Sequence, residues 1–134
     1  MPSTNTEENA MSVAEHKVIR LPRAVVWTCA IVLAVAFVLV GTSKMAGPSA
    51  LRWAERLAHW GYPAGAGYVI GGLEILGGLG VLIPRARRVA SATLMALMIG
   101  ALCTHAVQRE FPRLIPPLVL GGLAGLLYSS RPRP

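Results

Sequence analysis

Four long apolar runs divide this sequence and limit what the chain can fold into more than any other feature. The runs cover residues 24–43, 64–83, 89–107 and 114–128, and the last can span a membrane if it begins near Phe111. About 20 apolar residues cross the hydrocarbon core of a bilayer as a helix. A backbone in lipid must also pair its own polar groups. The sequence therefore predicts an all-α fold, a transmembrane four-helix bundle.

The composition agrees with a lipid environment. Hydrophobic residues make up 54% of the chain and charged residues 14%, which is roughly half the charged share of a soluble domain. The net charge is +7, but the basic residues stand singly or in small groups between the apolar runs and form no continuous face. We therefore expect the lipid bilayer, and not a nucleic acid, as the main partner.

The basic residues of the connections predict the orientation, because Lys and Arg concentrate on the cytoplasmic side. One side carries eight of them, namely Lys17, Arg20, Arg23, Arg85, Arg87, Arg88, Arg131 and Arg133. The other side carries four, namely Arg52, Arg56, Arg109 and Arg113. This bias places both termini in the cytoplasm. We expect a disordered cytoplasmic tail over residues 1–22, a membrane domain over 23–130 and a second cytoplasmic tail over 131–134.

Two segments leave alternatives open. Residues 48–62 keep apolar positions at helical spacing, which favours a short amphipathic helix in the interface between the first two spans. A simple packed loop is the alternative. The first span also has basic residues before it and small residues after it, as a cleaved signal peptide does. The long polar leader and Lys44, which interrupts the region of a cleavage site, favour a retained helix.

Glu74 stands near the middle of the second span, where an ionised carboxylate costs about 2.5–3.5 kcal/mol in lipid. Three glycines share its helical stripe, namely Gly67, Gly71 and Gly78. Small residues let a neighbouring helix come close, and Gly121 with Gly125 repeats this pattern in the fourth span. Glu74 is therefore expected to point into the bundle.

Lys44, late in the first span, and His105, late in the third, are the candidate partners of Glu74. Glu74 lies about 15 Å from the outer end of its predicted helix, so a bridging water or a helix tilt is expected between it and Lys44. One interpretation is a buried polar pair that fixes helix register. Another is a site that handles protons or a quinone, since these groups shift their proton affinities at low dielectric. A third is a site completed by a partner subunit.

Other chemistries find little support in the sequence. Cys29 and Cys103 form no C-x-x-C pair, which argues against a disulfide framework. His16 and His59 lie outside the spans, which argues against a haem held by two histidines. No group of residues has the spacing of metal ligands, so no metal site is expected.

Three segments together resemble the DoxX family of small membrane proteins: GTSKMAG, HWGYPAGAGYVIGGLEILGGLGVLIPR and RARRVASATLMALMIGA. The resemblance covers roughly residues 23–129. The residues that match the family's pattern are Gly41, Lys44, Gly71, Glu74, Gly77 and Gly78. Membership implies a four-helix fold in the bacterial inner membrane and a link to membrane redox assemblies, since the family is named after a subunit of a thiosulfate:quinone oxidoreductase. Distant relatives that manage disulfides use paired cysteines, and this chain has none.

Three functional hypotheses follow. The first is an accessory or structural membrane subunit, not itself an enzyme, that assists quinone-linked redox chemistry in a partner subunit. The second is a quinone-binding oxidoreductase subunit in which Glu74 and His105 exchange protons with a quinol. The third is a transporter or channel built as a homo-oligomer, with Glu74 facing a water-filled path. Quinone is the one cofactor that these hypotheses invoke.

Overall fold

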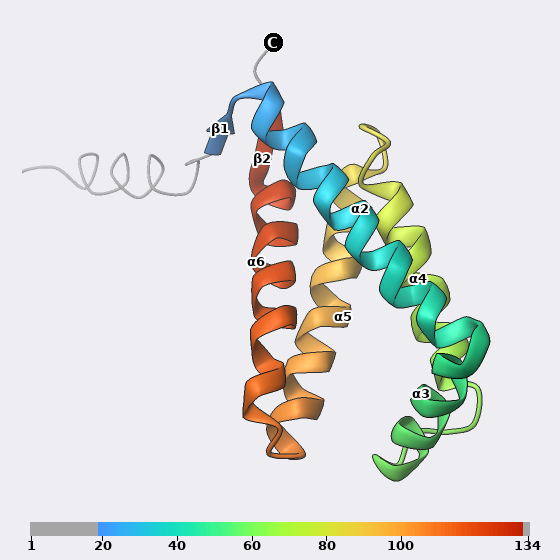
Figure 1. Cartoon of the computed structure of the whole chain (residues 1–134). Coiled ribbons are helices and arrows are strands. Elements are labelled where there is room, and N and C mark those ends of the chain that lie inside the picture. The colour runs from blue at the N-terminus through green and yellow to red at the C-terminus, as the bar shows by residue number, and fades with distance from the viewer. Residues whose placement is uncertain (1–18, 133–134) are drawn as a thin grey trace, which may run out of the picture.

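The computed structural model describes residues 19–132, and most of them are helical. Figure 1 shows four helices that run alternately up and down, with a shorter helix, α3, at one end of the bundle. In chain order the helices are α2 (Arg23–Met45), α3 (Gly47–His59), α4 (Ala66–Gly80), α5 (Arg87–Val107), the 3-10 turn η1 (Phe111–Leu114) and α6 (Ile115–Ser129). The predicted all-α bundle is confirmed.

Three helical stretches of the described residues are long and apolar enough to cross a membrane. They are Arg23–Met45, Arg87–Val107 and Phe111–Ser129, in which η1 extends α6 to the predicted start at Phe111. The fourth, α4, is apolar but has only 15 residues. It is about 22 Å long, less than the ~30 Å of a typical hydrocarbon core. By the composition of its helices, the chain is a multi-pass membrane protein.

Glycines and turns make α4 shorter than the apolar run predicted over residues 64–83. Gly61 and Gly65 both have φ near 85°, a left-handed conformation that interrupts a helix and that glycine adopts at little cost. At the other end the chain turns after Gly80, and the N–H of Ile83 donates to its carbonyl at 3.1 Å. Pro84 then follows, which cannot donate to a continuing helix. Residues 64–65 and 81–83 therefore lie outside α4.

Two short strands join the ends of the described chain. β1 (Ile19–Leu21) pairs in parallel with β2 (Ser130–Pro132), which the sequence did not predict. Figure 1 shows this pair at the end of the bundle opposite α3. Residues 1–18 and 133–134, which make up most of the two predicted tails, lie outside the described residues. The cytoplasmic position of this end stays a prediction.

The amphipathic segment after α2 is a helix, and the alternative of a packed loop is wrong. Of its apolar positions only Leu57 is buried, while Trp53 is half-buried and Leu51 is exposed. Trp53, Leu57 and Trp60 share the face that turns toward the bundle, because they follow each other at helical spacing. That α3 lies in the membrane interface stays a prediction.

The backbones of α2 and α4 approach each other closely at two glycines, Gly41 and Gly71. A Cβ atom added to Gly41 would lie 2.6 Å from the carbonyl oxygen of Gly71, and one added to Gly71 would lie 2.7 Å from that of Gly41. Further along, a Cβ at Gly78 would lie 3.1 Å from Cβ of Phe37. No side chain fits at the crossing of Gly41 and Gly71. Contact of this kind holds helices together in lipid, where burial of apolar surface drives little association.

We predict that Gly71→Ala destabilises the protein by about 1–3 kcal/mol, because the added methyl group overpacks the crossing. Gly72→Ala is the matched control, since a Cβ at Gly72 meets nothing within 4 Å. Alanine favours a helix more than glycine does, so the control should be neutral or slightly stabilising. Unfolding in detergent, followed by circular dichroism, measures both effects. Equal effects of the two substitutions would contradict the close crossing.

Candidate functional site

Lys44 and Glu74 form a direct ion pair between α2 and α4. The ammonium group of Lys44 donates to both carboxylate oxygens, at 2.9 Å to Oε1 and 2.7 Å to Oε2 of Glu74. The two side chains are only 6% and 4% exposed. Nζ of Lys44 also lies 4.5 Å from the centre of the Trp53 ring of α3, a favourable cation–π distance. Each buried charge thus has an opposite charge in contact, which a charge in lipid requires.

The glycine crossing brings the two charges within reach of each other. A Cβ at Gly71 would lie 3.2 Å from Cβ of Lys44, and a Cβ at Gly41 would lie 3.2 Å from Cβ of Glu74. Lys44 is therefore level with Gly71, and Glu74 is level with Gly41. Because the helices are antiparallel, the paired residues differ in height by about one turn, or ~5 Å. The extended stem of a lysine covers that distance.

A bridging water is therefore not needed, because the ammonium group of Lys44 reaches both carboxylate oxygens of Glu74 directly. The prediction measured the depth of Glu74 from the outer end of its predicted span and placed Lys44 at that same end. In the structure α4 starts beyond the level of Lys44, because a Cβ at Gly67 would lie 3.6 Å from the carbonyl oxygen of Lys44. The difference in depth between Lys44 and Glu74 is therefore much smaller than the ~15 Å that separates Glu74 from the outer end of its predicted span.

A cavity of about 270 Å³ adjoins the ion pair. It lies between α2 and α4 on one side and α5 on the other, and α3 covers it. Figure 1 shows α2 and α4 diverging from α5 and α6 toward the end that carries α3. The residues that line the cavity are Lys44, Trp53, Leu57, Trp60, Tyr62, Ile70, Glu74, Ala96, Leu97, Met98, Gly100, Ala101, Thr104 and His105. Most of its wall is apolar or aromatic, with a few polar groups, as in most small-molecule sites.

His105 lines this cavity but pairs with Glu110 and not with Glu74. Its Nδ1 lies 2.9 Å from Oε2 of Glu110, and its ring meets the Trp60 ring edge-on at 5.5 Å between centres. The chain after α5 folds back, since the N–H of Glu110 donates to the carbonyl oxygen of His105 at 2.9 Å. The hydrogen bond from His105 holds the pKa of the Glu110 carboxyl below its usual value, and nearby Arg113 and Arg56 lower it further. The three predicted residues thus share one cavity but form two separate pairs.

Sequence reasoning missed several residues of the site. Trp60, Tyr62 and Thr104 are not among the residues that the sequence predicts for the site. In the structure the hydroxyl groups of Tyr62 and Thr104 are hydrogen bonded at 2.6 Å, which ties the turn after α3 to α5. The helical spacing of Trp53, Leu57 and Trp60 was the available signal for the cavity-facing side of α3. Glu110 gave no signal, because it lies in a polar loop.

The glycines expected to pack helices differ in what they contact. Gly41, Gly71 and Gly78 lie at the contact of α2 with α4, and Gly67 lies beside Leu57 of α3. A Cβ at Gly77 would lie 2.6 Å from Leu94 of α5. In α6 a Cβ at Gly121 would lie 3.2 Å from Met98, while one at Gly125 would make only ordinary contact with Met95. Gly80, which the sequence did not single out, faces Ala90 at 2.8 Å.

We predict that Lys44→Met and Glu74→Gln each lower the free energy of unfolding by about 3–5 kcal/mol, because each leaves one charge buried without its counter-charge. The double variant should lose less than the sum of the two, since neither charge is left unpaired. Unfolding titrations in detergent measure all three values. Single variants as stable as the wild type would show that the ion pair does not stabilise the bundle.

The bond between His105 and Glu110 predicts a dependence on pH. Because the folded state lowers the pKa of Glu110, its stabilising effect is present at neutral pH and lost as the pH falls below the usual glutamate value of about 4.3. The stability difference between wild type and Glu110→Gln should therefore shrink on acidification. Thermal unfolding in detergent at several pH values measures this. Glu55→Gln, which removes an exposed carboxylate that forms no ion pair with the described residues, should match the wild type at neutral pH.

Comparison with known proteins identifies the family. The model of the DoxX-like family matches residues 28–127, about three quarters of the chain. The match begins in α2 and ends in α6, so it includes the ion pair and every residue that lines the cavity. No curated protein and no solved structure gives a significant match. This multi-pass membrane protein belongs to the DoxX-like family.

Proposed function

We propose that this DoxX-like protein is an accessory subunit of a quinone-linked redox system in the bacterial inner membrane, and that its cavity holds the ring of a quinone. The observation that carries the proposal is the composition of the cavity. One space between the helices contains an ion pair, a histidine and three aromatic side chains.

The size of the cavity supports a small, flat ligand. At about 270 Å³ it lies just below the range of roughly 300–1,000 Å³ that is typical of drug-sized ligands. It therefore suits a quinone ring better than a whole lipid. Trp53 of α3 and Trp60, which directly follows α3, offer aromatic surfaces on which such a ring can stack. An isoprenoid tail would leave the ring toward the lipid that surrounds the bundle.

The polar groups of the cavity suit the oxygen atoms of a quinone. Lys44 has three N–H donors, and Glu74 occupies two of them. The hydroxyl group of Thr104 lies on the opposite wall, on α5. His105 uses Nδ1 toward Glu110, which leaves Nε2 for a ligand. A quinone carbonyl can accept a hydrogen bond from Lys44, and a quinol hydroxyl can donate one to Nε2 of His105.

In this proposal the chain binds and positions the quinone, while a partner subunit exchanges the electrons. The alternative is a more active role, in which Glu74 and His105 exchange protons with a quinol. The geometry favours the binding role, because Lys44 already balances the charge of Glu74 and donates hydrogen bonds to both of its carboxylate oxygens. His105 lines the cavity and is the better candidate to accept a proton from a quinol.

Quinone binding can be tested on the purified protein in detergent. Titration with a short-chain ubiquinone analogue or with menadione should quench tryptophan fluorescence, since Trp53 and Trp60 line the cavity. We predict that Ala101→Leu weakens binding by at least tenfold, because its larger side chain fills the cavity. Ala106→Leu is the matched control, as an exposed residue of the same helix that does not line the cavity.

Solvent extraction of gently purified protein gives an independent measurement, and a bound quinone should appear in the absorbance spectrum. Binding that Ala101→Leu and Ala106→Leu leave equally strong would place the quinone elsewhere. A preparation that contains no quinone and that neither analogue quenches would overturn the proposal.

A further inference from the structure

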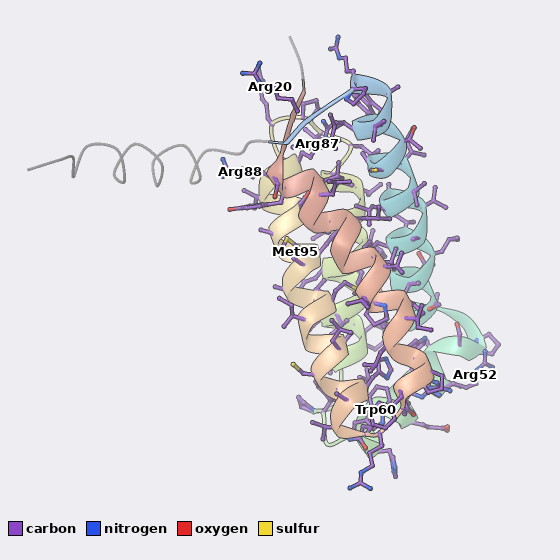
Figure 2. The ribbon with its side chains drawn as sticks, turned by 90° about the vertical axis from the view of Figure 1, so that its left-hand side faces the viewer. Arg20, Arg52, Trp60, Arg87, Arg88 and Met95 are labelled. Carbon is purple, nitrogen blue, oxygen red and sulfur yellow. The ribbon has the colours of Figure 1, made fainter. Side chains whose placement is uncertain are left out.

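A second hollow lies on the other side of Trp53, outside the cavity described above. It measures about 250 Å³ and is lined by Ser43 of α2 and by Ser49, Arg52, Trp53 and Arg56 of α3. The four residues of α3 stand at positions i, i+3, i+4 and i+7, so they form one stripe of the helix. Figure 2 shows Arg52 projecting from the bundle at the end that carries Trp60, away from Arg20, Arg87 and Arg88.

Arg52 and Arg56 both line this hollow, and neither has an acidic partner among the described residues. Among residues 19–132, no carboxylate lies within 4.0 Å of Arg52 or Arg56. Glu55 lines a different hollow, on the side of α3 that faces the start of α4. The charge of Arg56 helps to lower the pKa of the Glu110 carboxyl, but this carboxylate pairs with His105 and Arg113. Like charges four residues apart on a helix destabilise it, so an anion in the hollow would relieve this repulsion.

The arrangement also prepares Arg56 for binding. Its guanidinium lies 5.6 Å from the centre of the Trp53 ring and 5.6 Å from that of the Trp60 ring. Contact with two indoles restricts the side chain, and its N–H groups make no hydrogen bond to the described residues. Arg52 is exposed. A planar fork matches two oxygens of a phosphate or carboxylate group in two parallel hydrogen bonds, which a chloride ion cannot form.

The position of the hollow in the bundle indicates where the phosphate comes from. It lies at the end of α2, a membrane-spanning helix, and on the amphipathic helix α3, which carries Trp53 and is directly followed by Trp60. Indole rings and basic side chains of this kind are found at the level of lipid headgroups. A phosphate at that level belongs to a phospholipid of the adjacent leaflet, and an anionic lipid concentrates at basic segments.

We infer that the hollow formed by Ser43, Ser49, Arg52 and Arg56 binds the headgroup phosphate of an anionic phospholipid. The lipid holds α3 against the end of α2 and thereby keeps the cover of the neighbouring cavity in place. This inference does not depend on quinone binding, because the two sites lie on different sides of Trp53.

The test uses the full-length protein, purified and delipidated in a neutral detergent. Short-chain phosphatidylglycerol, short-chain phosphatidylcholine and inorganic phosphate are titrated separately, and the midpoint of thermal unfolding is recorded. Phosphatidylglycerol should raise the midpoint, while phosphatidylcholine and phosphate should have little effect at the same concentration. Native mass spectrometry of the same samples should show retained phosphatidylglycerol.

Three substitutions locate the binding. Arg52→Gln and Arg56→Gln should each weaken the apparent affinity for phosphatidylglycerol by roughly tenfold, because each removes a charged hydrogen-bonding group. Arg109→Gln should leave it unchanged, as an exposed arginine at the same end of the bundle and outside the hollow. Arg52 makes no hydrogen bond or ion pair to the described chain, so its substitution should leave the unliganded protein folded.

Each result decides for or against the site. Equal loss of affinity in Arg52→Gln and Arg109→Gln would show diffuse attraction and overturn it. Stabilisation by inorganic phosphate as strong as that by phosphatidylglycerol would overturn the assignment to a lipid. An equal response to phosphatidylcholine would overturn the preference for an anionic headgroup.

Discussion

The crossing of α2 and α4 at Gly41 and Gly71 is the contact on which the rest of the structure depends. In lipid the burial of apolar side chains drives little association between helices, so close backbone contact has to hold them together. This crossing has no room for a side chain on either glycine. It also sets the register of the two helices, and that register brings Lys44 to Glu74. A buried carboxylate that would be costly in lipid becomes half of an ion pair with two hydrogen bonds.

The short helix α3 completes the site from outside the spans. Trp53 touches both hollows and contacts the ammonium of Lys44, so it connects the ion pair to the interfacial side of the protein. Leu57 is the buried residue of α3. The hydrogen bond between Tyr62 and Thr104 ties the turn after α3 to α5. The cavity is therefore covered by an element that its own contacts hold against the bundle. Aromatic surfaces and a few fixed polar groups face this small, mostly apolar space.

The sequence predicts the helices of this fold well, since long apolar runs leave a chain few alternatives in lipid. It also indicates that Glu74 faces protein, because a carboxylate in a stripe of glycines has no other favourable position. It does not predict where α4 begins and ends, which depends on the turns around Gly65 and Gly80. The pairing of His105 with Glu110 escapes prediction for a similar reason. The loop after α5 folds back on its helix, and polarity alone gives no sign of that path.

Lys44 and Glu74 are in direct contact inside the bundle. The most direct measurement is the dipolar coupling between the side-chain nitrogen of Lys44 and the carboxyl carbon of Glu74, by solid-state NMR of labelled protein in lipid bilayers. Contacts of 2.7 Å and 2.9 Å between nitrogen and oxygen predict a strong coupling and the chemical shift of an ionised carboxylate. No detectable coupling, or a protonated Glu74 remote from Lys44, would contradict this account.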